Sequence, residues 1–390
     1  MDHGELGTFL LAFAAALLGA KVFGEIAERY GQPAVLGELL VGILLGPSLL
    51  GLVPLSAGIL LVAEIGVLLL LFEVGLETDL EELAKVGGAA MAVAVVGMVV
   101  PFASGYLVTK AAGYPTLTAI FVGAALTATS IGITSRVLSE LKALKSREGQ
   151  IILGAAVADD ILGLVVLAVV SQIAATGSVA LSDAVKAAGL SLGFLLVAIL
   201  GGMPLGRVLV RVVGKAHVRG ILVAVAVAFA LLAAFGAQTA GSAAIVGAFA
   251  AGLVLARTNR GHDIETAVRP VVDVFAPVFF VAIGAQVNVA YLNPSTPENR
   301  AALLLALGLT VVGVLGKFAA GFAAWGKVSR AFIGAGMIPR GEVGLIFAQI
   351  GKQSGALPEP VFVAVVLAVF ATTFVTPPLL KALRPARAGS

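Results

Sequence analysis

The chain has 390 residues, of which 59% are hydrophobic and 12% charged, and its formal net charge is +3. This composition indicates a polytopic membrane protein. The lack of cysteine excludes disulfides and thiolate metal sites. The basic residues lie in short loops between apolar runs, which argues against a nucleic-acid-binding protein.

Apolar runs long enough to cross a bilayer follow one another along the whole chain. The first run has no basic region before it and no small-residue cleavage site after it, so we expect a retained helix. The loops are too short for a separate soluble domain or a cofactor-binding module. We predict an all-α protein with thirteen transmembrane helices near residues 6–26, 33–53, 56–76, 87–110, 116–139, 148–174, 184–213, 218–236, 241–257, 270–290, 300–325, 329–351 and 359–382.

Lysine and arginine are concentrated in every second loop between these runs. Basic loops stay in the cytoplasm, so this alternation predicts an external N-terminus and a cytoplasmic C-terminus in the inner membrane. The same alternation supports the count of thirteen, because a missed helix would invert every loop after it.

The sequence also repeats at a spacing near 210 residues. Residues 34–45 resemble 244–255, and residues 72–77 resemble 281–286. Seven spans separate the matching helices, so the two copies cross the membrane in opposite directions. This predicts two inverted-topology repeats of six helices joined by a linker helix at 181–214, the plan of many secondary transporters.

Each half contains one segment that interrupts a membrane helix. Residues 126–135 are rich in hydroxyls, and residues 336–344 contain a proline that lacks the helical backbone donor. We expect two crossing discontinuous helices, whose freed carbonyls and half-helix ends can bind a cation. The hydroxyls could instead bond back to their own helix. The residues placed at these breaks are Thr127, Ala128, Thr129 and Ser130 in the first half, and Pro339, Arg340, Gly341 and Glu342 in the second.

Two adjacent acids, Asp159 and Asp160, lie in the middle of the apolar run 151–170. Buried carboxylates persist in a membrane only beside a cation, a partner or water, so we expect a functional site; a structural ion pair is the alternative. Lys317 lies at the same depth in another segment and needs a carboxylate, for which either aspartate is suitable.

Arg340 is also expected inside the membrane. We expect it to support the core by pairing with Glu342 or with a glutamate of the early segments, such as Glu73. Contact with the transported ion is a poorer interpretation, because a fixed guanidinium repels cations.

These motifs resemble sodium/proton antiporters of the second monovalent cation:proton antiporter family. The resemblance rests on the acid pair after Ile151–Val157, the Thr127–Ser130 break, the Gly316-Lys317 pair and the Pro339–Ile346 stretch, and it covers the whole membrane chain. Two acids in place of one indicate the sodium-type, electrogenic branch.

The resemblance implies that Asp160 is the principal cation-binding and proton-carrying carboxylate and that Asp159 forms a salt bridge with Lys317. Sodium would bind at both aspartates, with Thr129 and the backbone of residues 127–128 lining the site. It implies an elevator-type homodimer in the lipid bilayer, with no cofactor, that exchanges sodium or lithium for protons. The implied division is a dimerisation domain at 1–78 and 218–292, a core ion-transport domain at 79–175 and 298–384, and the linker helix at 181–214.

Three other functions remain open from the residues. A potassium/proton antiporter would use the same residue types. An organic-anion symporter would need a larger, more amphipathic pocket and would not require Lys317. A cation channel would conduct sodium without moving protons against it, so exchange is the property that separates these classes.

Overall fold

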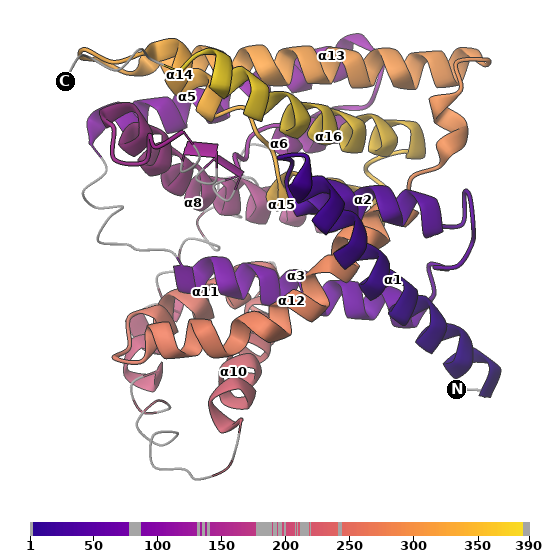
Figure 1. The fold of residues 1–390 in the computed structure, drawn as a ribbon, viewed down its shortest axis with the longest axis vertical. Helices are drawn as coiled ribbons and strands as arrows, with labels where there is room; N and C mark the ends of the chain where they lie inside the picture. Colours follow the sequence, from indigo (N-terminus) through magenta and orange to yellow (C-terminus); the bar gives the residue numbers. More distant parts are fainter. Residues whose placement is uncertain are drawn as a thin grey trace. The chain divides into compact units, whose positions relative to one another are not determined.

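The structure, a computed structural model, describes residues 3–77, 87–130, 141–176, 200–206, 220–240 and 244–384, with further single positions or pairs within 133–138 and 189–218. Every regular element in these residues is a helix (Figure 1), which confirms the all-α prediction. Seven of the described helices are long and apolar enough to cross a membrane. The expected linker helix at 181–214 lies mostly outside the described residues, so the count of thirteen stays a prediction.

The chain divides into two compact units, each built from both halves of the sequence. Unit 1 contains residues 1–24, 37–79 and 167–286. Its helices are α1 (His3–Arg29), α2 (Ala34–Leu45), α3 (Ala57–Glu77), α10 (Ile221–Thr239), α11 (Ala244–Ala256) and α12 (Gly261–Ala285). The end of α1 and the start of α2 lie within residues 25–36 and belong to unit 2.

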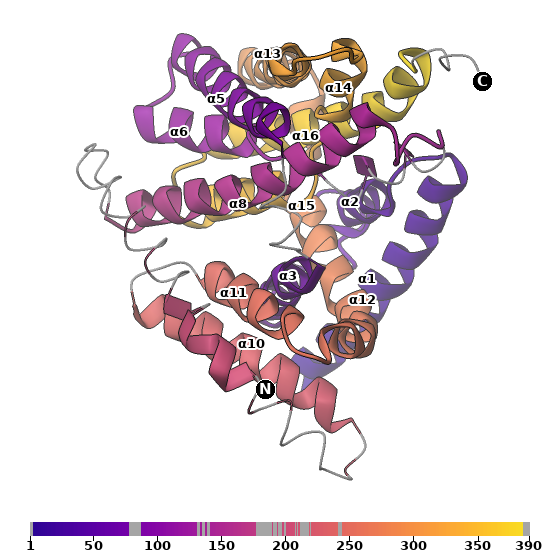
Figure 2. The same ribbon diagram turned by 90° about the vertical axis from the view of Figure 1, so that its left-hand side faces the viewer.

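Unit 2 contains residues 25–36, 80–166 and 287–390. Its helices are α5 (Gly88–Ala111), α6 (Thr116–Ala125), most of α8 (Arg147–Thr176), α13 (Pro297–Ala320), α14 (Arg330–Gly336), α15 (Glu342–Gln353) and α16 (Glu359–Ala382), with short 3-10 turns η1 (Val289–Leu292) and η2 (Gly321–Ala323). Helix α13 packs against α5 and α16 (Figure 2).

The boundaries of two helices, α2 and α12, differ from the predicted ones by eight or nine residues. Helix α2 ends at Leu45, earlier than the predicted 53, because the next residue, Gly46, precedes Pro47, and the residue before a proline disfavours the helical conformation. Helix α12 begins at Gly261 and not near 270. Its first turns carry charged residues on an amphipathic surface, which a search for apolar runs does not include.

Glycines in unit 1 reproduce the predicted repeat as contacts. A Cβ at Gly75 of α3 would lie 2.3 Å from the carbonyl oxygen of Phe249 in α11, and a Cβ at Gly284 of α12 would lie 2.2 Å from that of Leu39 in α2. These distances are far below van der Waals contact, so only glycine permits the two backbones to approach.

The pair α1–α2 and the pair α10–α11 are also equivalent. A Cβ at Gly37 would lie 2.1 Å from the carbonyl oxygen of Phe23, and a Cβ at Gly247 would lie 2.2 Å from that of Ala233. Equivalent residues of the two copies are 209 residues apart for Gly75 and Gly284, and 210 residues apart in the other three pairs. The repeat detected in the sequence is therefore a repeat of helix packing in unit 1.

Candidate functional site

The two predicted breaks cross inside unit 2. Helix α6 ends at Ala125 and α14 ends at Gly336. The backbone is not helical in residues 126–130 after α6 or in residues 338–341 after α14. The backbone N–H of Ser130 donates to the carbonyl of Pro339 at 2.9 Å. Backbone groups that a continuous helix would pair internally are thus paired between the two breaks.

Hydroxyl groups strengthen this crossing. Thr129 Oγ1 donates to the carbonyl of Met337 at 3.1 Å, and Thr134 Oγ1 donates to that of Gly336 at 2.9 Å. The crossing is close because residue 341 is glycine: a Cβ there would lie 2.8 Å from the side chain of Ser130.

Thr127 behaves differently from Thr129. Its hydroxyl donates to the carbonyl of Ala124 in its own helix at 2.7 Å, the local bonding that was the alternative interpretation of this cluster. Thr127, Ala128, Thr129 and Ser130 are all buried. The hydroxyl cluster therefore contains both kinds of threonine, one that caps α6 and one that joins the breaks.

The charged centre of unit 2 is an ion pair between α8 and α13. Lys317 Nζ lies 2.8 Å from Asp159 Oδ2, and both side chains are fully buried. Lys317 stands in the last turn of α13, where the helix dipole favours a cation. The other carboxylate oxygen, Asp159 Oδ1, accepts no hydrogen bond from the described residues.

Small residues fit the lysine between its helices. A Cβ at Gly97 of α5 would lie 3.7 Å from Lys317 Nζ, and one at Gly316 would lie 3.2–3.3 Å from Pro101. An alanine at either position would be crowded against the facing helix, since a Cβ at Gly97 would also lie 3.3 Å from the Cβ of Ala320. Glycine at these two positions therefore leaves room for α5 and α13 to pack closely beside Lys317.

Asp160 follows Asp159 in the middle of α8, but its side chain lies outside the described part of the structure, as does that of Glu342 at the start of α15. Helix α8 itself is well placed: a Cβ at Gly336, where α14 ends, would lie 2.7 Å from the side chain of Ile152. The acid-bearing helix thus packs directly against one of the two breaks.

Arg340 is among the largest fully buried side chains of the protein. Its Nη2 donates to the carbonyl of Gly313 in α13 at 3.3 Å, whereas Nε and Nη1 have no hydrogen-bond partner among the described residues. The carboxylate of Asp159 is close enough to interact with it electrostatically. Its own backbone carbonyl accepts a hydrogen bond from Thr373 of α16.

Glu73, which was considered as a partner of Arg340, belongs to unit 1. Its carboxylate lies 3.5 Å from Arg269 Nε of α12, and Arg269 Nη2 also donates to Glu77 at 3.0 Å. Glu73 thus pairs with Arg269, at the point where α3 and α12 pack together.

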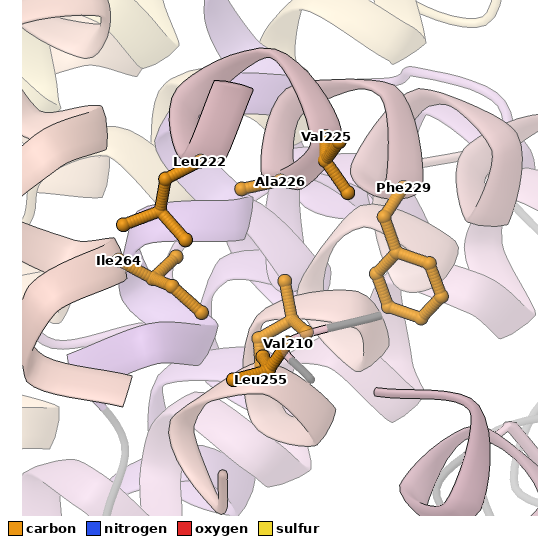
Figure 3. Close-up of a pocket in the computed structure, with 7 residues that line it drawn as sticks. All are labelled: Val210, Leu222, Val225, Ala226, Phe229, Leu255 and Ile264. Carbon is orange, nitrogen blue, oxygen red and sulfur yellow. The ribbon is translucent and has the colours of Figure 1, made fainter. Parts of the chain in front are cut away.

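Three contributors to the site have no distinctive sequence signal: Gly97, Gly313 and Thr373. Glycine is abundant in the membrane segments, so no single glycine is distinctive. Thr373 is preceded by another threonine, Thr372, in the same apolar surroundings. Only the pairing of the helices distinguishes them. A pocket in unit 1 (Figure 3) offers no alternative ion site, because it is lined entirely by hydrocarbon, from Val210, Leu222, Val225, Ala226, Phe229, Leu255 and Ile264.

Comparison with known proteins identifies the family of the chain. Residues 11–383 match the family model described as "Sodium/hydrogen exchanger, transmembrane". The chain is 42% identical to the high-affinity Na(+)/H(+) antiporter NhaS3 of Synechocystis, over 97% of this chain and 90% of that protein. It is 38% identical to the Na(+)/H(+)-K(+) antiporter GerN of Bacillus cereus, over 96% and 95% of the two chains.

A solved structure shares the fold. The sodium proton antiporter MjNhaP1 of Methanocaldococcus jannaschii superposes with a TM-score of 0.73 over 97% of this chain and 96% of that one, at 18% sequence identity. The family model spans nearly the whole chain, from the first apolar helix to the end of α16. This multi-pass membrane protein therefore belongs to the sodium/hydrogen exchanger family.

Proposed function

We propose that the protein is a secondary active antiporter that exchanges sodium or lithium ions for protons across the inner membrane. The observation that carries the proposal is the Asp159–Lys317 ion pair, fully buried beside two crossing helix breaks. An uncompensated carboxylate at this depth is costly, so the carboxylate binds either a cation or a proton. Because the two compete for one group, the movement of one ion is coupled to the movement of the other. Relatives named as sodium/proton antiporters support the same choice of ions.

The proposed division of roles follows from charge. Asp160 would bind the ion and carry the proton, while Asp159 is held by Lys317 and offers Oδ1, which has no donor in the described residues, to the ion. Thr129 and the backbone of residues 127–128 would complete a site of oxygen ligands suited to an alkali cation. Arg340, Ser130 and Glu342 would hold the two breaks together.

Exchange would follow from competition at this site. With sodium or protons bound, the net charge of the site is small enough for the site to pass a hydrophobic barrier. With bare carboxylates, the net charge is too large. A lower pH favours the protonated site, so the apparent KM for sodium should rise as the pH falls. Two protons per sodium is the stoichiometry we propose for the aspartate pair, which makes exchange electrogenic.

For the whole molecule we propose an elevator-type mechanism in a homodimer. A dimerisation domain at 1–78 and 218–292 would stay fixed while a core ion-transport domain at 79–175 and 298–384 carries the site. The glycine contacts of α3 with α11 support a rigid unit 1, and the hydrogen bonds between the breaks support a rigid unit 2. We propose an external N-terminus and a cytoplasmic C-terminus.

Potassium/proton exchange is the second candidate, because GerN is named as an antiporter of both sodium and potassium. The deciding experiment uses purified protein in vesicles with a preformed pH gradient. Sodium and lithium should dissipate the gradient, and potassium should do so much less. Equal responses to the three ions would indicate a general monovalent-cation exchanger, and sodium flux without proton movement would indicate a channel.

A further inference from the structure

Three segments of unit 2 meet at one end of its helices. They are residues 141–148 before and at the start of α8, residues 322–330 before α14, and residues 379–384 at the end of α16. The backbone N–H of Ser329 donates to Glu148 Oε1 at 3.0 Å, and a Cβ at Gly326 would lie 2.9 Å from Arg147 Nη2. A hydrophobic cluster that includes Leu141, Ala324 and Leu380 connects the three segments.

These segments carry a dense group of cations, which we call the basic surface. Its members are exposed and, among the described residues, have no ion-pair partner: Lys142, Lys145, Arg147, Lys327, Arg330 and Arg384. Glu148 is the acid in these segments, and its carboxylate accepts the bond from Ser329. Within the described residues, the basic surface therefore has a net positive charge that no ion pair neutralises.

Two cations of unit 1, by contrast, are paired with carboxylates. Arg269 contacts Glu73 and Glu77, and Arg260 donates to Asp263 at 3.0 Å. Retention of basic loops on one side of the membrane would apply to both units equally. It does not account for a group of six cations on three adjacent segments that have no carboxylate partner among the described residues.

Aromatic side chains mark the depth of the basic surface. Trp325, the single tryptophan of the chain, is 54% exposed, and Phe322 is 56% exposed. Tryptophan is enriched at the level of lipid headgroups, where its ring meets both hydrocarbon and water. Arg147 and Arg330 are the first residues of α8 and α14, so their charges lie at the ends of membrane helices.

From this combination we infer that the basic surface binds the phosphate headgroups of anionic phospholipids. The charges stand where headgroups are concentrated, they are exposed, and the exposed aromatic rings beside them fit the same interface. Juxtamembrane lysines and arginines are attracted to anionic lipid, and salt screens this attraction. Anionic lipid would then act on unit 2, the unit that contains the candidate ion site.

The test compares two full-length variants that lose equal charge. Lys142→Gln/Lys145→Gln/Lys327→Gln alters the basic surface, and Lys21→Gln/Arg257→Gln/Arg260→Gln removes three cations from unit 1. The Tm of each protein in detergent is measured with phosphatidylglycerol and with phosphatidylcholine, at low and high salt. The readout does not depend on exchange, so it can fail independently of the proposed function.

Phosphatidylglycerol should raise the Tm of the unaltered protein and of the unit 1 variant, and high salt should remove the effect. The basic-surface variant should lose most of this shift while keeping its Tm in phosphatidylcholine. Inorganic phosphate at the same concentration should have no comparable effect, which separates a lipid site from a phosphate site. An equal phosphatidylglycerol shift in both variants, or a larger loss in the unit 1 variant, would overturn the inference.

Discussion

Asp159 and Lys317 form a hydrogen-bonded ion pair of 2.8 Å between α8 and α13, with both side chains fully withdrawn from solvent. Removing one partner of such a pair leaves an unpaired buried charge and costs roughly 3–5 kcal/mol, whereas removing both leaves neutral groups. We expect Asp159→Asn and Lys317→Gln each to lower the Tm strongly, and the double variant to be more stable than either. Melting and exchange are measured for all four proteins.

The coupling between the two residues decides this prediction. If the losses of the single variants simply add, the pair contributes nothing of its own, and Lys317 is compensated mainly by another carboxylate such as Asp160.

Asp160→Asn should abolish exchange of sodium and lithium in reconstituted vesicles. An amide neither titrates nor supplies the charge that a dehydrated cation needs, although it has nearly the same volume. The Tm in the absence of sodium should stay close to that of the unaltered protein. Asp160→Glu is the matched control that retains a carboxylate, and we expect residual exchange with a changed KM for sodium. Sodium-driven proton movement in Asp160→Asn would transfer the role to Asp159.

Thr373→Val should destabilise the break at Arg340. The Thr373 hydroxyl donates to the carbonyl of Arg340, which lies outside any helix, so its removal leaves a buried acceptor unpaired at a cost of about 1–3 kcal/mol. The neighbouring Thr372 is equally buried, but its hydroxyl donates only to carbonyls of its own helix, at Ala368 and Val369. Thr372→Val is therefore the control.

The two threonine variants are compared by Tm and by exchange rate. The bond from Thr373 holds the break only if Thr373→Val loses more of both than Thr372→Val does; a larger loss in Thr372→Val would contradict this role.

Gly75→Ala should destabilise unit 1. The added methyl group would lie 2.3 Å from the carbonyl oxygen of Phe249, a backbone atom that cannot rotate away, and such overpacking typically costs about 1–3 kcal/mol. By the repeat, Gly284→Ala should lose a similar amount. Gly236→Ala in α10 is the control, because a Cβ there meets nothing within 4 Å. Denaturation in detergent measures all three, and equal stability of Gly75→Ala and Gly236→Ala would refute the packing argument.

The sequence predicts those features that depend on burial energy. Apolar runs locate the helices, and the cost of a buried charge predicts that Lys317 pairs with one of the two adjacent aspartates, which the structure shows to be Asp159. Proline and the hydroxyl cluster locate the breaks for a similar reason, because they alter which backbone groups a helix can pair. The repeat is visible because glycines needed for close approach recur at one spacing.

Features that depend on backbone acceptors could not be predicted in this way. Arg340 contacts the carbonyl of Gly313, and every residue has a carbonyl, so this contact has no signal in the sequence; the expected pairing with Glu342 concerns a side chain outside the described residues and stays a prediction. The extra turns of α12 were missed because their charged residues are amphipathic and not apolar. Thr372 and Thr373 look alike in sequence, and only the crossing of α16 with the break distinguishes them.

The glycine contacts of α3 also constrain how the protein is made. The partners of Gly66 and Gly75 belong to α12 and α11, which the ribosome synthesises only after residues 80–166, the first half of unit 2, have left it. During synthesis, helix α3 is therefore in the bilayer without α11 and α12 packed against its glycines, while the first half of unit 2 is already being made. Unit 1 should be completed late in biosynthesis, and a nascent chain that stalls before residue 244 should expose α3 to the proteases that remove unassembled membrane helices.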